Sequence, residues 1–397
     1  MKVISTEKLS IKMWLEKIED GAMAQIRNLA NLPFAFHHIA IMPDSHQGYG
    51  MPIGGVLATK GVIIPNAVGV DIGCGMCAVK TSLTKLGTET LKKIMGDIRK
   101  VVPVGFEHHK EEQDERLMPS MGTLHDFEEC HFNNNCPSPV VCKEYEKARQ
   151  SLGTLGGGNH FIEIQKGSDG HIWIMIHSGS RNLGKQVADH YNKIAIKLNE
   201  KYFSSVDPKQ ELAFLPLDSK EGKSYIREMN YCVEFALANR KLMMENIKDI
   251  FVKETNCSFD DMINIAHNYA RMENHFGQNV MVHRKGATLA TEDTIGIIPG
   301  SQGTKSYIVK GKGNKESFNS CSHGAGRKMG RKEAERSLNL EDEIKILNDQ
   351  GIIHAIRGVN DLDEASGAYK PIDEVMRNQS DLVEILIELT PLGVIKG

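Results

Sequence analysis

The chain has 397 residues, of which 40% are hydrophobic and 25% are charged, and its formal net charge is −3. This composition is typical of a globular protein with a large core, and it excludes a disordered chain or a uniformly basic coat. We find neither a signal peptide nor a run of about 18 uncharged apolar residues, so we expect a cytoplasmic protein without membrane contact. In a reducing compartment the eight cysteines are expected to be thiols or metal ligands rather than disulfides.

The first stretch with polar residues that lack an evident structural reason is "VGVDIGCGMCAVKT", at residues 68–81. It contains Asp71 and Cys74, and Cys74 forms a C-x-x-C pattern with Cys77. A thioredoxin-like pair would need a helix start, and a zinc knuckle would need a second close C-x-x-C, and neither is present. Asp71 and Cys74 are therefore candidate ligands of another kind of site, with the redox pair kept as an alternative.

Residues 105–145 have many charges and little periodicity, which indicates an excursion from the core. We expect this excursion to line a substrate surface, although a solvated loop is an equal alternative. A zinc site is also open here, but its spacings are wider than those of common zinc fingers. The candidate zinc ligands are His125, Cys130, His131, Cys136 and Cys142.

Both helices and strands are predicted, and we find no repeat and no low-complexity linker that would divide the chain. Short β-rich runs predict strands at 171–177, 279–283 and 305–309. Apolar stripes at helical spacing predict helices over 187–198 and 233–251. The sequence therefore predicts an α+β fold in one domain that spans residues 1–397.

Several histidines follow glycine-rich runs or end apolar ones. Each alone could be a core or surface histidine. Together with Asp71 and Cys74 they provide nitrogen, oxygen and sulfur donors of the kind that bind divalent transition metals, and one thiolate can bridge two ions. The residues singled out on this basis are Asn159, His160 and Glu163 in "GGGNHFIE", His177 in "IMIHSGSR", and His267 with Asn268 in "INIAHNYA".

Two later loops combine glycine and serine with lysine or arginine, as phosphate-binding loops do. They are "GIIPGSQGTKSYIV" at 296–309 and "SCSHGAGRKMGRKEA" at 320–334. Neither matches the P-loop pattern of NTPases. His323 in the second loop is a candidate nucleophile that would form a phosphoramidate, provided that an acceptor holds its other ring nitrogen. A histidine that only contacts phosphate is the alternative.

The motifs in combination resemble the RtcB family of RNA-splicing ligases over nearly the whole chain. The matching stretches include "MPDSHQGYGMPIGGV", "GVDIGCG", "LGTLGGGNHFIEI", "HSGSR", "PGSQGTKSYIV", "SCSHGAGR", "AYK" and the terminal "KG". The resemblance implies a compact domain of mixed β-sheets and surrounding helices with a deep two-metal cleft. It also implies an enzyme that uses GTP and two Mn(II) ions to join an RNA end with a 3′-phosphate or 2′,3′-cyclic phosphate to a 5′-hydroxyl end.

Carried over by motif, the resemblance assigns a role to each candidate. Cys74 would bridge two manganese ions, with His177 and His267 on one ion and Asp71 and His160 on the other. His323 would be the guanylylated histidine, and Asp44 would orient its ring. The GTP pocket would comprise Asn159, His160, Phe161, Ile162, Glu163, His267, Asn268, Pro299, Gly300, Ser301, Gln302, Ser306, His323, Gly324, Ala325, Gly326 and Lys396.

Two other classes of function compete with the ligase, which would act in RNA repair or tRNA splicing. A Mn(II)-dependent phosphodiesterase would need the metal ligands but not His323 or the GTP loops. A non-catalytic RNA-binding module would need neither. The residues expected for metal and nucleotide binding are all present, which favours the ligase. The sequence does not indicate the natural RNA target, the need for an activating partner protein or the oligomeric state.

Overall fold

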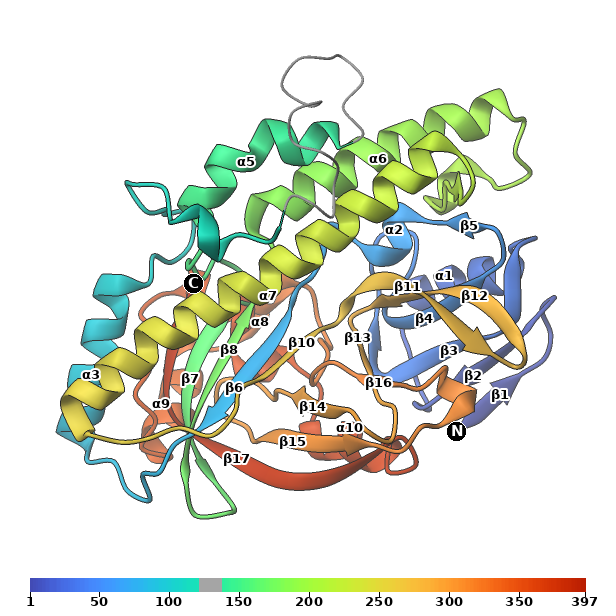
Figure 1. Cartoon of the computed structure of the whole chain (residues 1–397). Coiled ribbons are helices and arrows are strands. Elements are labelled where there is room, and N and C mark those ends of the chain that lie inside the picture. Colours follow the sequence, from blue (N-terminus) through green and yellow to red (C-terminus); the bar gives the residue numbers. More distant parts are fainter. Residues whose placement is uncertain (121–137) are drawn as a thin grey trace.

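Two β-sheets with helices packed around them make up the computed structural model, which describes residues 1–120 and 138–397 (Figure 1). The six-stranded sheet is built mainly from the N-terminal part of the chain, and two strands from its second half complete it. In spatial order its strands are β1 (Lys2–Ile4), β2 (Ser10–Met13), β3 (Ala35–His46), β4 (Ile53–Thr59), β12 (Gln278–Lys285) and β11 (Asn268–His275).

The seven-stranded sheet carries most of the residues predicted to form the site. In spatial order its strands are β10 (Ile263–Ala266), β6 (Gly75–Lys80), β8 (Ile172–Ser178), β7 (Phe161–Gly167), β17 (Val383–Lys396), β15 (Ser306–Gly311) and β14 (Ile295–Ile298). Two short ribbons, β5 (Val62–Ile63) with β9 (Leu215–Pro216) and β13 (Ala287–Leu289) with β16 (Ser320–Ser322), complete the described strands.

The C-terminal strand β17 lies inside the seven-stranded sheet, not at its edge. Its first half pairs with β15 and its second half pairs with β7, with a register shift between Pro391 and Gly393. Lys396 thereby lies opposite Phe161. Backbone pairing on this scale fixes the end of the chain, so the penultimate lysine is not part of a frayed tail.

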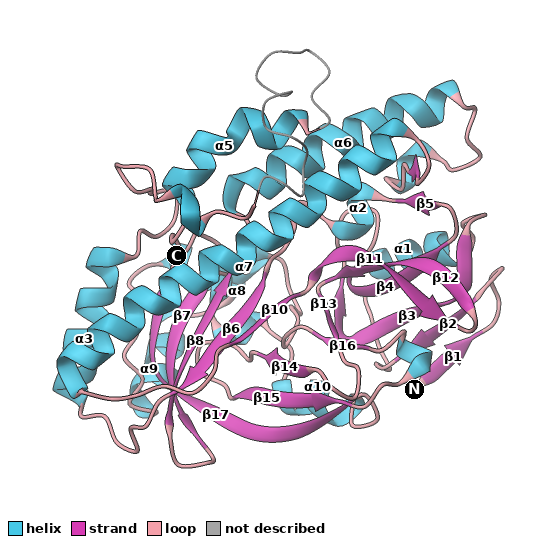
Figure 2. Cartoon of the chain, in the orientation of Figure 1, coloured by secondary structure: helices cyan, strands magenta, loops and turns pink. Residues whose placement is uncertain are grey.

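The helices lie around the two sheets, and the 36-residue helix α7 runs across the seven-stranded sheet (Figure 2). Its Ser219 N-cap accepts a hydrogen bond from the Gly222 N–H, and Asn256 ends it in a left-handed conformation. The described helices are α1 (Asp20–Ala30), α2 (Pro65–Val68), α3 (Thr88–Val101), α5 (Pro139–Ser151), α6 (Arg181–Lys201), α7 (Lys220–Thr255), α8 (Arg331–Ser337), α9 (Leu340–Asp349) and α10 (Ile372–Asn378).

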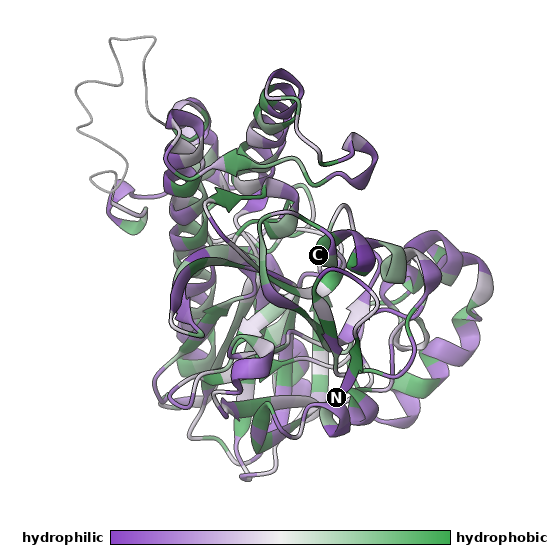
Figure 3. Ribbon diagram, turned by 90° about the vertical axis from the view of Figure 1, so that its right-hand side faces the viewer, coloured by the Kyte–Doolittle hydropathy of each residue, from purple (hydrophilic) through white to green (hydrophobic). Residues whose placement is uncertain are grey.

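Buried side chains join the two sheets into one core. Val56 of β4 and Val282 of β12 pack in the same cluster as Ile298 of β14 and Val309 of β15. The outer helices carry both hydrophilic and hydrophobic residues, as expected of elements with one buried face (Figure 3). The predicted fold class, a single compact domain of mixed helices and sheets, is confirmed.

The structure also confirms the predicted elements, apart from part of the excursion. Both predicted helices fall within α6 and α7, and the three predicted strands correspond to β8, β12 and β15. The prediction of an irregular segment is wrong for 139–145, because α5 begins at Pro139 and buries Val141 and Tyr145 four residues apart.

The zinc candidates in the excursion fall mostly on residues for which no structure is described. His125, Cys130, His131 and Cys136 lie outside the described residues, and Cys142 is a half-buried cysteine on α5. Within the two described ranges, no helix has both the length and the apolar character that crossing a membrane requires.

Candidate active site

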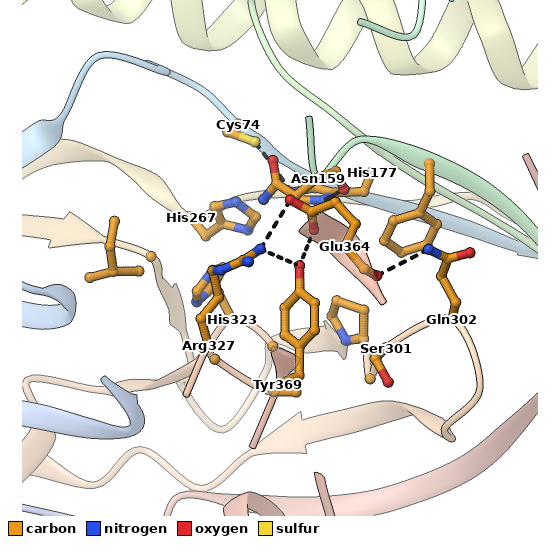
Figure 4. A pocket seen from close by; sticks show the side chains of 18 of the residues that line it. Cys74, Asn159, His177, His267, Ser301, Gln302, His323, Arg327, Glu364 and Tyr369 are labelled. Atoms are coloured by element: carbon orange, nitrogen blue, oxygen red, sulfur yellow. Dashed lines mark hydrogen bonds and ion pairs between the residues drawn. The ribbon is translucent and has the colours of Figure 1, made fainter. Parts of the chain in front are cut away.

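A cavity of about 370 Å³ brings together residues from nearly every motif singled out in the sequence. Its wall includes the loop before β6, the start of β7, the end of β8, and the loops that precede β15 and follow β16. Figure 4 shows Cys74, His177, His267 and His323 on one side of this cavity and Gln302, Glu364 and Tyr369 on the other. Segments far apart in the sequence thus converge on one place.

Cys74, His160 and His177 form a buried cluster whose ligand atoms lie within 4.8 Å of one another. The Cys74 Sγ lies 3.3 Å from His177 Nε2 and 3.5 Å from His160 Nε2. Asp71 joins this cluster, because its Oδ2 lies 3.2 Å from the same nitrogen of His160. A thiol, imidazoles and a carboxylate at such distances could hold a divalent transition metal ion.

Backbone carbonyls fix the two imidazoles in the orientation that metal binding requires. Nδ1 of His160 lies 2.9 Å from the Leu155 oxygen, and Nδ1 of His177 lies 3.1 Å from the Asn159 oxygen. A carbonyl can only accept, so each Nδ1 donates its proton and each Nε2 presents a lone pair to Cys74.

Burial sets the protonation of these ligands. It lowers the pKa of His177 and His267, and neighbouring histidines lower both further, so the imidazoles remain neutral. Burial and the charge of Asp71 raise the pKa of the Cys74 thiol, whereas a coordinated metal ion would remove its proton. The Nδ1 of His267 is buried and has no hydrogen-bond partner among the described residues. A buried ring nitrogen without a partner, close to a thiol, neutral imidazoles and a carboxylate, is compatible with a bound cation.

His323 lies against this cluster and is held by a buried carboxylate. Its ring centroid lies 4.7 Å from that of His267. The Oδ2 of Asp44 lies 2.6 Å from Nδ1 of His323 and also accepts the His323 backbone N–H at 3.1 Å. With Nδ1 donating to Asp44, Nε2 of His323 carries the free lone pair, as a nucleophile requires.

Lys396 and Glu163 lie on adjacent strands in the same wall of the cavity. The Lys396 ammonium lies 5.9 Å from the centre of the Phe161 ring. Burial lowers the pKa of Lys396, opposed by the charges of Glu364 and Asp363. Burial also raises the pKa of Glu163 to about 8, against a hydrogen bond from Gln165 and the charge of Lys396. This wall therefore places a buried carboxyl group and a half-buried amino group side by side in the cavity.

A polar network closes the opposite side of the cavity. Arg327 donates to Glu364 at 3.1 Å, and the Tyr369 hydroxyl donates to the same carboxylate. The side-chain N–H of Gln302 donates to the Glu364 backbone oxygen at 3.0 Å, and the buried Gln302 Oε1 has no hydrogen-bond partner within residues 1–120 and 138–397. In the phosphate-type loop, Gly300 N–H donates to the Ser306 hydroxyl at 3.2 Å.

Most of the sequence-predicted residues line the cavity, and four lie behind its wall. Asp44 lies behind His323, and His160 lies behind Cys74. Ser306 supports Gly300, whereas the Ile162 side chain packs in the core. The predicted residues that line the cavity are Asp71, Cys74, Asn159, Phe161, Glu163, His177, His267, Asn268, Pro299, Gly300, Ser301, Gln302, His323, Gly324, Ala325, Gly326 and Lys396.

Sequence reasoning missed several residues of the cavity wall. His46 and Tyr369 belong to motifs that were noted, "MPDSHQGYG" and "AYK", and could have been singled out there. Arg331 belongs to the phosphate-type loop noted at 320–334 and could also have been singled out there. Glu364 carries no local signal, because it is an ordinary charged residue until the fold places it against Arg327 and Arg331. The wall residues outside the predicted set are His46, Ile53, Val70, Gly286, Arg327, Arg331, Glu364, Tyr369 and Val394.

A Cys/His cluster beside a carboxylate-held histidine, enclosed by glycine-rich loops, is typical of metal-dependent phosphoryl-transfer enzymes. Comparison with known proteins agrees with this class. The family model "tRNA-splicing ligase RtcB" matches residues 25–397. The chain belongs to the RtcB family.

Relatives from distant organisms match almost the whole chain. RNA-splicing ligase RtcB of Escherichia coli K12 is 37% identical over 416 residues, which cover 100% of this chain and 99% of that protein. The tRNA-splicing ligase RtcB of Thermococcus kodakarensis is 33% identical, with 96% and 92% covered. RNA-splicing ligase RtcB of Mycobacterium bovis is 32% identical, with 94% and 100% covered.

Proposed function

We propose that the whole chain, residues 1–397, acts as one RNA ligase domain that joins a 3′-phosphate or 2′,3′-cyclic phosphate end to a 5′-hydroxyl end, in RNA repair or tRNA splicing. The observation that carries this proposal is the position of His323. Its Nδ1 is 2.6 Å from Asp44, and its ring lies beside the Cys74 cluster in one cavity. Membership of the RtcB family supports the ligase over the other classes.

In the proposed reaction, Nε2 of His323 attacks the α-phosphorus of GTP. A P–N bond forms, the bond to the β-phosphate oxygen breaks, and pyrophosphate leaves. Asp44 keeps the proton on Nδ1 and stabilises the positive charge that develops on the ring. The burial of Asp44, which is 0% exposed, strengthens this interaction.

Two further displacements complete the proposed ligation. An oxygen of the RNA 3′-phosphate attacks the guanylate phosphorus and releases His323. The 5′-hydroxyl oxygen of the second RNA then attacks the activated 3′-phosphorus, and GMP leaves as the phosphodiester forms. A cyclic phosphate would first be hydrolysed to the 3′-phosphate.

Asp71, Cys74, His160, His177 and His267 would hold the two Mn(II) ions of the proposal, with Cys74 shared. When bound, such ions neutralise the charge on attacking and leaving oxygens. The neutral imidazoles and the partnerless nitrogen of His267 support this assignment.

GTP would occupy the rest of the cavity. Glu163 and Lys396, on the β7–β17 wall, are placed to accept base N–H groups and to contact anionic oxygens, respectively. The loop at 323–326 could offer the backbone N–H groups that follow His323 to phosphate, and the loop at 299–302 could offer that of Gln302.

Incubation with GTP labelled on its α-phosphate, in the presence of Mn(II), tests this proposal. We expect a protein adduct that is labile to acid and stable to base, as a phosphoramidate is. Metal-dependent cleavage of RNA without any adduct would support the phosphodiesterase instead. RNA binding without either reaction would support a non-catalytic module.

Removal of Lys396 and Gly397 should slow the formation of this adduct by at least about tenfold, which corresponds to about 1.4 kcal/mol in transition-state stabilisation. The reason is that β17 holds the half-buried Lys396 ammonium group in the wall of the cavity where GTP would bind. The rate should be measured at saturating Mn(II) across a GTP titration.

Lys396→Met serves as the matched variant, because it keeps the strand and the apolar part of the side chain. It should reproduce the loss with little change in the thermal unfolding temperature. An unchanged rate and GTP affinity in both variants would remove Lys396 from the active site.

A further inference from the structure

Phe106 is fully exposed although the backbone around it is firmly held. Its side chain has 100% of its surface accessible to solvent. The Gly105 N–H donates to the Gly156 oxygen at 2.9 Å, and Arg181 donates to the Gly105 oxygen at 2.9 Å. The Glu107 N–H closes a tight turn onto the Val104 oxygen at 3.1 Å. The ring is therefore presented to solvent from a fixed turn rather than from a loose loop.

This turn lies beside the glycine loop that leads into the candidate active site. Val104 and Gly156 form a parallel bridge, and Asn159, three residues after Gly156, lines the cavity. The C-terminal Gly397, next to Lys396, donates to the His160 oxygen at 3.3 Å and abuts Gly156. Figure 1 shows this part of the chain, between α3 and α5, close to the C-terminus.

A cation lies at the other end of the same glycine loop. A Cβ at Gly158 would come within 2.9 Å of the Arg331 guanidinium, so the arginine covers this glycine closely. The Arg331 side chain is 48% exposed and also lines the cavity. Gly157 and Gly158 are half-buried and carry no side chain, and they lie between Arg331 at the cavity and the turn that carries Phe106.

We propose that Phe106 is a stacking platform for an unpaired base of the RNA end that enters the cavity. This inference rests on the proposed ligase function. A strand that reaches the cavity past Gly157 and Gly158 would place a phosphate near Arg331 and a neighbouring base over the ring. Aromatic stacking accepts any base, which suits a ligase that must act on ends of varied sequence.

The feature of this turn that suits RNA binding is an aromatic ring and not a positive charge. The exposed charged residues that follow Phe106, at 107–112, are Glu107, Lys110, Glu111 and Glu112, which do not form a basic patch. Phe106 itself carries no charge, so its removal should leave the salt dependence of RNA binding unchanged. This separates a stacking residue from a phosphate contact, whose loss reduces the salt dependence.

The test is ligation of two single-stranded oligoribonucleotides, one with a 3′-phosphate and one with a 5′-hydroxyl, at saturating GTP and Mn(II). We expect Phe106→Ala to raise the KM for RNA about five- to thirtyfold, which corresponds to about 1–2 kcal/mol. The kcat should change by less than about twofold, and Phe106→Trp should restore the KM.

Phe203→Ala is the matched control. Phe203 is 94% exposed, and it lines a separate cavity that shares no residue with the candidate active site. This variant should have the KM of the unmodified protein. Formation of the His323 adduct, which involves no RNA, and thermal unfolding report whether each variant is folded.

Three results would overturn the inference. The first is an equal KM for Phe106→Ala and the unmodified protein, and the second is an equal rise in Phe203→Ala. The third is a loss of adduct formation or stability in Phe106→Ala, which would make the residue structural. If the unmodified protein neither forms an adduct nor ligates RNA, the proposed ligase function is wrong, and the role of Phe106 in stacking on the RNA substrate is wrong as well.

Discussion

His323→Ala should abolish both the GTP adduct and the ligation of 3′-phosphate ends, with a loss of at least about four orders of magnitude in rate. The substitution removes the nitrogen that attacks GTP and leaves every proposed metal ligand in place. Bound Mn(II) should therefore stay near the level of the unmodified protein. Adduct formation, ligation and metal content can be measured on one preparation.

RNA that already carries a 3′-guanylate cap is the control for this variant. The cap supplies the activated phosphate that His323 would otherwise have produced, so the variant should still seal capped RNA to a 5′-hydroxyl end. Ligation of uncapped 3′-phosphate ends by His323→Ala would show that another group is the nucleophile.

The Cys74→Ser variant should bind fewer Mn(II) ions per chain than any variant that lacks one histidine ligand. A shared thiolate contributes to both ions, whereas each imidazole serves one. We expect less than about one ion per chain in the serine variant under conditions where His160→Ala, His177→Ala and His267→Ala each keep about one. Metal analysis after gel filtration measures this.

Cys77→Ser is the matched control, because it changes a second buried cysteine three residues away. Cys77 packs in the core with Val79 and Ile176, so its substitution should affect stability and leave the metal content unchanged. A metal loss in Cys77→Ser would favour the C-x-x-C interpretation. Two tightly bound ions in Cys74→Ser would make Cys74 a packed thiol and leave Asp71 as the shared ligand.

The secondary structure of the long periodic segments could be predicted from the sequence. The stripes at 187–198 and 233–251 mark α6 and α7, because a helix with one buried face must repeat its apolar residues at helical spacing. Around Pro139 the same reasoning failed, because charged residues dominate the segment and only tertiary packing shows that one face of α5 is buried.

The candidate site was predictable to the extent that its residues belong to motifs. The glycine-rich loops that end in His160 or surround His323 have a composition that is unusual for a core or surface segment. Glu364 had no such composition around it, in contrast to its partner Arg331, which lies in the loop at 320–334. Their ion pair, at 3.1 Å, exists only because α8 and the segment before Tyr369 meet at the cavity.

The sequence by itself determined which chemical groups this protein has available: a thiol, histidines, carboxylates and phosphate-type loops, in the order of one family. Only the tertiary structure decided that these groups meet, because the Cys74, His160 and His177 side chains come from separate segments joined by strand pairing between β6, β8 and β7. It also decided that Lys396 is a fixed cavity residue, since β17 is inserted between β7 and β15. Long-range pairing of this kind leaves no local pattern in a sequence, because partners such as Phe161 and Lys396 lie far apart in the chain.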